Sequence, residues 1–344
     1  IEYQPMTDYV ENTIHSELNK NGIKCPLTTL RGILNSEFSP KHDPFQEYFL
    51  SLPKWDGKED LISQLADTVE VSAEERNLWR HFFKKWLVAL VATTLTDSVV
   101  NHTVLVLAGK QGIGKTTWLL HLVPPALQSY VYSGSINPNN KDTMAYLAEC
   151  ILINLDELEN LKTSEVGALK EVITKGVINF RRAYGHNNEN YVRKASFCGS
   201  VNSQSFLNDL TGSRRWLCFN ALSINHTRFQ NLDMVYSQAV SLFNSGFEYW
   251  LNPKEIAVLS ANNEKYQEVS KEQDVLLSFF EPVKNKSEAK FLYSSTKVIL
   301  YLQEKTGLSF SPIMMGKVLS GNGFIKTKQS GSCVWLLKER EVGG

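Results

Sequence analysis

The chain has 344 residues, and its 36 Lys and Arg balance 36 Asp and Glu, so the formal net charge at pH 7 is zero. This length suits two or three domains, and the balanced charge excludes a protein drawn to nucleic acid by its overall field. The longest apolar run, residues 86–95, is much shorter than the ~20 residues of a membrane-spanning helix. With no secretion signal and five scattered cysteines, we expect a cytoplasmic protein without a membrane partner.

Residues 1–97 are predicted to be mainly helical. Within them, Ser72 and Glu75 match a capping box, and apolar residues follow at helical spacing from Leu78 to Val91. This apolar stripe predicts a helix that packs into the protein core. Because the chain begins at Ile1 rather than Met, we also expect it to be a fragment of a longer protein.

From Thr103 onward, short β-rich runs alternate with helical segments, which is typical of layered α/β proteins. The expected strands cover residues 103–109, 150–157, 178–185, 191–202 and 214–222, and the expected helices cover residues 114–123, 169–176 and 232–250. The strands before and after the polar turn HNNEN are expected to pair as a hairpin. We therefore predict an α/β core over residues 98–270.

Residues 271–344 are expected to form a separate small domain. Helices are predicted from Asp274, over residues 296–306 and over residues 311–321, followed by two strands within residues 324–338. This order of elements indicates a winged-helix-like fold. From Lys284 to Arg340 there are ten Lys or Arg and three Asp or Glu, an excess that fits a solvated face or contact with phosphates.

The stretch LAGKQGIGKTTW, residues 107–118, matches the phosphate-binding pattern G-x-x-x-x-G-K-[ST]. A predicted strand precedes it and a predicted helix follows, which is the context that this pattern requires. Backbone N–H groups of such a loop bind phosphates, Lys115 is expected to reach the β- and γ-phosphates, and Thr116 is expected to ligate Mg²⁺. The cofactors are therefore ATP and Mg²⁺, and the expected contacts are Gly109, Gln111, Gly112, Ile113, Gly114, Lys115, Thr116 and Thr117.

Polar side chains stand where two buried strands are expected to end. Asp156 and Glu157 follow the apolar run ILINL, and Asn202 follows ASFCGSV. Ligands bind at the carboxyl ends of strands in open α/β sheets, so Asp156 is predicted to hold Mg²⁺ and Glu157 to act as general base on the attacking water. Asn202 would orient that water, although Asn also simply forms turns.

Two basic groups complete the candidate site. Arg214 and Arg215 precede the last core strand, and a guanidinium suits the spread charge of a phosphoryl transition state, often from a neighbouring subunit; either Arg could instead form a structural ion pair. In the predicted hairpin, Tyr184 is placed to stack on a base. The basic residues of this region outnumber the single Glu189 and could bind a nucleic-acid backbone; they are Lys175, Arg181, Arg182, Arg193 and Lys194. The alternative is an exposed hairpin with solubilising charges.

Over roughly residues 45–250, the sequence resembles the virulence-associated protein E family. The resemblance is in the order of the phosphate loop, the acidic strand, the basic hairpin, the Asn and the Arg-Arg pair. That family is similar to the phage and poxvirus-type primase-helicases of helicase superfamily 3. The resemblance implies an AAA+ ATPase with a three-layer P-loop core that assembles into a ring around DNA, expected as a hexamer. It also implies a primase-like unit, either as a missing N-terminal domain or as a partner.

The resemblance also assigns residues. Lys115 and Thr116 match the Walker A positions, Asp156 and Glu157 the Walker B pair, Asn202 the sensor Asn, and Arg215 the arginine finger with Arg214 as its neighbour. Lys170 falls where a basic residue of the adjoining subunit faces the nucleotide. Arg181, Arg182, Tyr184 and His186 match the pore hairpin that grips DNA, although the tip HNNEN is nearly neutral where a Lys-rich tip is common.

The expected function is therefore an ATP-driven DNA helicase or translocase that acts in the replication of a phage or mobile element. A nucleotide-gated DNA-binding switch that does not translocate is the alternative, favoured by the neutral hairpin tip and the winged-helix-like tail. A small-molecule kinase would share the phosphate loop but would have no use for Asn202 followed by two arginines.

Overall fold

The computed structural model describes residues 6–39, 42–137, 140–156, 158–160, 163–181, 187–203, 205–207, 213–267, 269–329 and 331–340. The chain divides into two compact units, Ile1–Leu52 and Pro53–Gly344. Across the described residues, no helix combines the length and the apolar character that crossing a membrane requires.

Within residues 6–39 and 42–52, the first unit contains three helices, α1 (Asp8–Lys20), α2 (Leu27–Leu34) and α3 (Pro44–Ser51). The hydroxyl of Thr7 caps α1 by accepting a hydrogen bond from the backbone N–H of Val10, and the Asp43 carboxylate caps α3 in the same way. An ion pair between Arg31 and Glu11, at 2.8 Å, joins α2 to α1.

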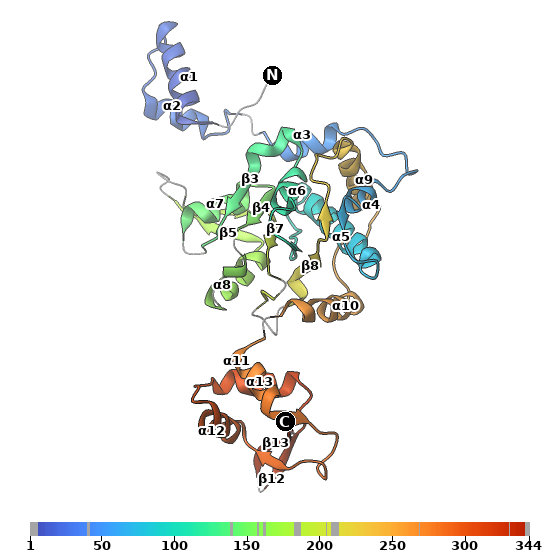
Figure 1. Ribbon diagram of the computed structural model, residues 1–344. Helices are drawn as coiled ribbons and strands as arrows, with labels where there is room; N and C mark the ends of the chain where they lie inside the picture. Colours follow the sequence, from blue (N-terminus) through green and yellow to red (C-terminus); the bar gives the residue numbers. More distant parts are fainter. Residues whose placement is uncertain are drawn as a thin grey trace. The chain divides into compact units, whose positions relative to one another are not determined.

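A parallel sheet of five strands forms the centre of the second unit (Figure 1). Its order is β3 (Val131–Gly134), β4 (Leu152–Leu155), β7 (Ser196–Val201), β2 (Val104–Ala108) and β8 (Trp216–Asn220). Every side chain of β2 and β4 is buried, as expected for strands covered on both faces. Because the strands are parallel, all five carboxyl ends lie along one edge of the sheet.

Helices cover both faces of this sheet. On one face, α7 (Lys141–Glu149) and α8 (Thr163–Thr174) contribute to a core with Val104 and Val106 of β2. On the other face, aromatic rings of α5 (Arg76–Leu95) pack against Trp118 of α6 (Lys115–His121) and Phe219 of β8. Two further helices, α9 (Leu232–Asn244) and α10 (Pro253–Asn263), contact α5 and β8, respectively. The core is therefore a three-layer α/β structure.

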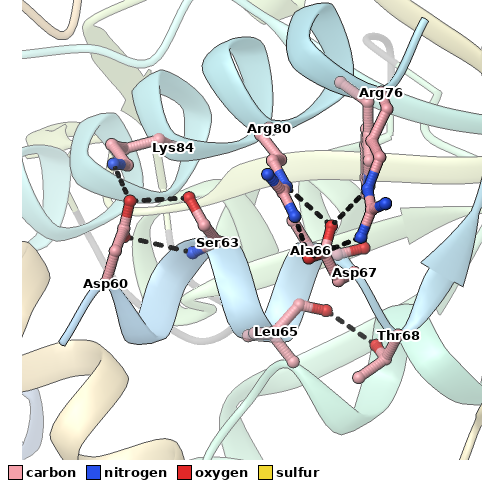
Figure 2. A network of polar contacts seen from close by, with 10 residues as sticks. Asp60, Ser63, Leu65, Ala66, Asp67, Thr68, Arg76, Arg80 and Lys84 are labelled. Atoms are coloured by element: carbon pink, nitrogen blue, oxygen red, sulfur yellow. Dashed lines mark hydrogen bonds and ion pairs between the residues drawn. The ribbon is translucent and has the colours of Figure 1, made fainter. Parts of the chain in front are cut away.

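The carboxylates of Asp60 and Asp67, which flank the short helix α4 (Leu61–Ala66), join it to α5 (Figure 2). Arg76 and Arg80 of α5 both pair with Asp67, and Lys84 donates to Asp60 at 2.5 Å. Burial raises the pKa of Asp60, but hydrogen bonds from Lys84, Ser63 and Gln238 outweigh it and lower the pKa to about 2. Asp60 is therefore ionised at neutral pH and anchors the start of α4.

Two small pairings lie beside the main sheet. Strands β5 (Val177–Phe180) and β6 (Glu189–Val192) form an antiparallel hairpin, with Val177 opposite Val192 and Phe180 opposite Glu189. Strand β1 (Val69–Glu70) pairs with β9 (Ser223–Ile224), which brings the chain after β8 next to the chain before α5.

In residues 271–329 and 331–340, the structure has α11 (Lys271–Phe279), α12 (Ser295–Thr306), α13 (Pro312–Gly321) and a sheet of three short strands and one long strand. The long strand β13 (Ser332–Glu339) pairs with β10 (Phe280–Pro282), β11 (Phe291–Tyr293) and β12 (Lys326–Gln329). The three helices and β13 share a core that contains Leu276, Leu302, Leu319 and Leu337.

Most of the expected core elements are confirmed, including β2, α6, β4, α8, the hairpin and β8. Four details of the sequence predictions were wrong. The expected turn HNNEN includes Glu189 and Asn190, which lie in strand β6 and pair with β5. The capping box at Ser72 does not form, because α5 begins at Arg76 and Glu75 pairs with Lys265 instead. The expected strand over residues 191–202 is divided into β6 and β7, and the helix expected over residues 232–250 ends at Asn244.

The compact units are a different division of the chain from the expected domains. Along the chain, the first compact unit ends at Leu52 and the second begins at Pro53. Helices α4 and α5, which fall in the region 1–97, pack inside the second unit, where the Trp86 indole N–H donates to the carbonyl of Phe197 in β7. The limits 1–97, 98–270 and 271–344 stay predictions.

Candidate functional site

The loop between β2 and α6 has the backbone of a phosphate-binding turn. Gly109, Gly112 and Gly114 have φ angles of 148°, 84° and 91°, and side-chain-bearing residues rarely adopt such values. At Gly114 space is also limited, because a Cβ atom there would lie 2.8 Å from Cγ and Nδ1 of the His226 ring. Gln111, Gly112 and Thr117 are exposed around this turn.

The amine of Lys115 points into the loop. Its Nζ atom donates to the carbonyl oxygens of Gly109 at 2.7 Å and Lys110 at 2.9 Å, and to Oδ1 of Asn202 at 3.1 Å. The residue is 6% exposed, and burial lowers the pKa of Lys115 although the nearby charge of Glu159 acts to raise it. An anion held by the loop would take the place of these neutral acceptors, and its bond with the ammonium would be stronger because both partners are charged.

The end of β7 lies directly beside the loop. The pairing of Ala108 with Val201 brings the carboxyl ends of β2 and β7 together, and this explains how Asn202 reaches Lys115. Two residues before Asn202, Oγ of Ser200 lies 2.9 Å from Oγ1 of Thr116 at the start of α6. The three predicted residues Lys115, Thr116 and Asn202 are therefore in one cluster.

Asp156 follows β4, which is the strand on the far side of β7. Its carboxylate accepts a hydrogen bond from Nδ2 of Asn154 at 2.7 Å and from Oγ of Ser133 at 3.1 Å. Two strand spacings of ~4.8 Å separate β4 from β2, so Asp156 and the loop share one edge of the sheet ~10 Å apart. Exposed at this edge, its carboxylate and the Thr116 hydroxyl are oxygen donors that fit Mg²⁺. Glu157 lies outside the described residues.

Glu159, in the short helical turn after β4 (Leu158–Asn160), was missed in the sequence predictions. Its Oε2 atom accepts hydrogen bonds from the backbone N–H groups of Asn202 at 2.7 Å and Ser203 at 3.1 Å. Its Oε1 atom accepts from Nδ2 of Asn202 at 3.1 Å. No motif spacing points to this residue, because its role depends on β7 being the neighbour of β4.

Arg214 and Arg215 lie at the end of the sheet where its parallel strands begin, opposite the end with the phosphate loop. They precede β8, and the pairing of Trp216 with Val104 puts the start of β8 beside the start of β2. The five residues of β8 advance about 13 Å along the sheet at ~3.3 Å per residue. The two guanidinium groups therefore belong to the edge opposite the loop of their own chain.

The hairpin differs from the sequence prediction in its basic residues. Arg193 was expected to contribute to nucleic-acid binding, but it is fully buried. Its guanidinium donates to carbonyl oxygens of Ala195, Val172, Ile173 and Asn101, and it lies 4.9 Å from the ring centre of Phe197. Arg193 joins the end of α8 to the start of β7, and burial lowers its pKa.

Other hairpin positions vary in their environment. Lys194 pairs with Asp97 at 2.9 Å, Lys175 pairs with Glu171 at 3.1 Å, and Arg181 is exposed. Arg182, Tyr184 and His186 lie outside the described residues. Lys170, the candidate for contact with a neighbouring subunit, is half-buried on α8.

The strand, the glycine-rich loop and the helix with Lys115 and Thr116 at its start define a P-loop α/β protein. A family model described as the virulence-associated protein E-like domain matches residues 50–268, which is more than half of the chain. The protein therefore belongs to the virulence-associated protein E-like domain family.

No curated protein matches the chain. Among solved structures, it is similar to the apo structure of the NrS-1 C-terminal region, with 12% identity and a TM-score of 0.44 over 83% of this chain and 77% of that one. An A-form apo structure of the same region has 10% identity and a TM-score of 0.43, over 83% and 76% of the two chains.

Proposed function

We propose that this protein is a replication-associated ATPase of the superfamily 3, AAA+ type, which hydrolyses ATP to move on or unwind DNA. The observation that supports the proposal is that the loop with Lys115, Asn202 and Asp156 lie along the carboxyl ends of three neighbouring strands, with Lys115 hydrogen-bonded to Asn202. Membership of the virulence-associated protein E-like domain family supports an enzyme that acts on nucleic acid in replication.

Each residue has a distinct task in this proposal. The loop N–H groups and Lys115 bind the triphosphate, while Thr116 and Asp156 hold Mg²⁺, which supplies positive charge against the phosphate oxygens. Glu157 accepts the proton of the attacking water, and Asn202 orients that water. Lys115 must leave the carbonyls of Gly109 and Lys110 to reach the β- and γ-phosphates.

The site is completed by a neighbouring copy of the chain. Arg215 precedes β8 and lies at the end of the sheet opposite the loop of its own chain. In this proposal it therefore supplies the transition-state guanidinium to the next subunit, with Arg214 beside it. This arrangement makes the active form a ring, expected as a hexamer, with ATP between subunits and Lys170 facing the same interface. The hairpin residues Arg181, Arg182, Tyr184 and His186 face the DNA.

The test measures ATP hydrolysis with and without single-stranded DNA, together with the molar mass by light scattering. We expect DNA-stimulated turnover in an assembled form, and its loss in Lys115→Ala. Lys254→Ala, which removes an exposed lysine of α10, is the matched control and keeps turnover. Turnover by Lys115→Ala equal to that of the wild type contradicts the proposal.

A second candidate, a nucleotide-gated DNA-binding switch without translocation, is favoured by the charge of the hairpin. Arg193 is buried and Lys194 and Lys175 are paired with acids, so the hairpin has less free positive charge than its sequence indicates. A forked-duplex assay separates the two candidates. A translocating helicase displaces a strand when it hydrolyses ATP, whereas a switch binds DNA in an ATP-dependent manner and displaces none.

A further inference from the structure

A polar relay connects Glu159 to the phosphate loop through one side chain. Glu159 accepts from Nδ2 of Asn202, and Oδ1 of the same amide accepts from Nζ of Lys115. A carboxylate only accepts hydrogen bonds and an ammonium only donates them, so the two ends fix which way round the amide lies. Oδ1 must face the phosphate loop, and Nδ2 must face Glu159.

Glu159 holds the backbone as well as the side chain. Its Oε2 atom takes both N–H groups that follow β7, from Asn202 and Ser203. Burial raises the pKa of Glu159. The hydrogen bonds from the two backbone N–H groups and from Nδ2 of Asn202, together with the charge of Lys115, outweigh burial and lower this pKa. The carboxylate is therefore ionised at neutral pH and accepts hydrogen bonds from three donors, two of Asn202 and one of Ser203.

We propose that Glu159 is a positioning residue for ATP hydrolysis, which keeps Oδ1 of Asn202 directed at the attacking water. This inference rests on the proposed function. When Lys115 turns to the phosphates, it releases Oδ1, while Nδ2 and the backbone N–H groups stay on Glu159. Oδ1 is then an unoccupied acceptor at a fixed place, and water that donates to it is oriented towards the phosphorus atom.

The substitution that tests this is Glu159→Gln, because it preserves size and changes only the hydrogen-bonding chemistry. The oxygen of Gln still accepts from the backbone N–H groups, but its NH₂ group now meets Nδ2 of Asn202. Two donors cannot pair, so the Asn202 amide turns and presents Nδ2 to the site. The loop stays folded, and the acceptor for water is lost.

We expect kcat to fall about 10- to 100-fold, the size of effect that a misplaced orienting group produces. ATP affinity, measured separately with a fluorescent ATP analogue, is expected to stay equal or to become tighter, because one negative charge near the phosphates is removed. Glu171→Gln removes an exposed carboxylate from α8 and is the matched control, with unchanged kcat.

A double-mutant cycle makes the test specific. If Glu159 acts only through Asn202, then Glu159→Gln lowers kcat in the wild type but adds little to Asn202→Ala. Additive losses overturn the proposal, as does a kcat within twofold of the wild type or an ATP affinity that falls as much as kcat.

Failure of the proposed function itself looks different. In that case the wild type and Lys115→Ala show the same ATP turnover, whatever Glu159→Gln does. The nucleotide-free protein then still reports on the relay through the side-chain NH₂ resonances of Asn202. Their exchange with solvent is slow in the wild type if Glu159 binds Nδ2, and a fast exchange that Glu159→Gln does not alter refutes the relay.

Discussion

Gly114→Ala isolates the two constraints that the phosphate loop places on its last glycine. The φ angle of 91° costs a residue with a side chain about 1 kcal/mol. The added Cβ would also lie 2.8 Å from two atoms of the His226 ring and 2.9 Å from its Cβ, and overpacking of this kind costs about 1–3 kcal/mol. We therefore expect the free energy of unfolding to fall by about 2–4 kcal/mol.

Gly112→Ala is the matched control for the backbone term. Gly112 has a similar φ angle of 84°, but a Cβ atom there meets no atom within 4 Å, so only the cost of about 1 kcal/mol remains. His226→Gly supplies the second comparison, since it removes the ring and the Cβ that Gly114→Ala would meet. In the double variant, the steric part of the loss, about 1–3 kcal/mol, is expected to be recovered.

Urea unfolding of the four variants at one pH, with the slopes compared, measures these differences. The reasoning is refuted if Gly114→Ala is no less stable than Gly112→Ala. It is equally refuted if His226→Gly restores nothing to Gly114→Ala, because the contact between the loop and the segment after β8 then carries no energy.

Three further outcomes follow from other parts of the molecule. The pKa of Asp60 is about 2 in the folded protein and 3.8 in the unfolded chain. The ionised carboxylate therefore stabilises the folded protein above pH 3.8, and this stabilisation is lost as the pH falls towards 2. Asp60→Asn should thus lower the unfolding free energy by about 1 kcal/mol at pH 7, after allowance for screening, and by less in urea titrations at pH 3; an equal loss at both pH values speaks against it. Arg193→Met leaves buried carbonyls without a donor and is expected to cost about 3 kcal/mol in urea unfolding, whereas the exposed Arg181→Met changes stability by less than about 0.5 kcal/mol; similar losses for both would exclude this account. Finally, Lys115→Ala and Arg215→Ala are each expected to be inactive as ATPases. A mixture of the two is expected to regain turnover, because some interfaces then combine an intact Lys115 with an intact Arg215. A mixture that assembles but stays inactive argues against a shared site.

The sequence was sufficient for the central features because local chemistry determines them. The run VLVLA is apolar throughout and short, so it predicts a strand buried on both faces, and the glycines after it predict the turn. Once β2 is recognised, the acidic end of β4 and the polar end of β7 follow from the rule that parallel strands end at one edge. In the structure, Lys115 donates to Asn202, and Thr116 lies beside Ser200 of β7.

What the sequence did not reveal depends on distant neighbours. Arg193 has the same local pattern as a surface arginine, and only the packing of α8 against β7 encloses it. Glu159 and His226 owe their places to strand order and to the pairing of β1 with β9, which no short pattern encodes. The capping box failed for a similar reason, because the distant Lys265 pairs with Glu75.

Only three residues, Arg193 to Ala195, separate the hairpin strand β6 from β7, which leads to the candidate site. Strand β6 runs through Arg193 into β7, and β7 ends one residue before Asn202. The peptide that forms one arm of the hairpin thus crosses the middle of the sheet and ends at the phosphate loop. Any displacement of β6 must therefore pass Arg193 before it reaches Asn202, and the hydrogen bonds of Arg193 to Val172, Ile173 and Asn101 hold the chain at that point.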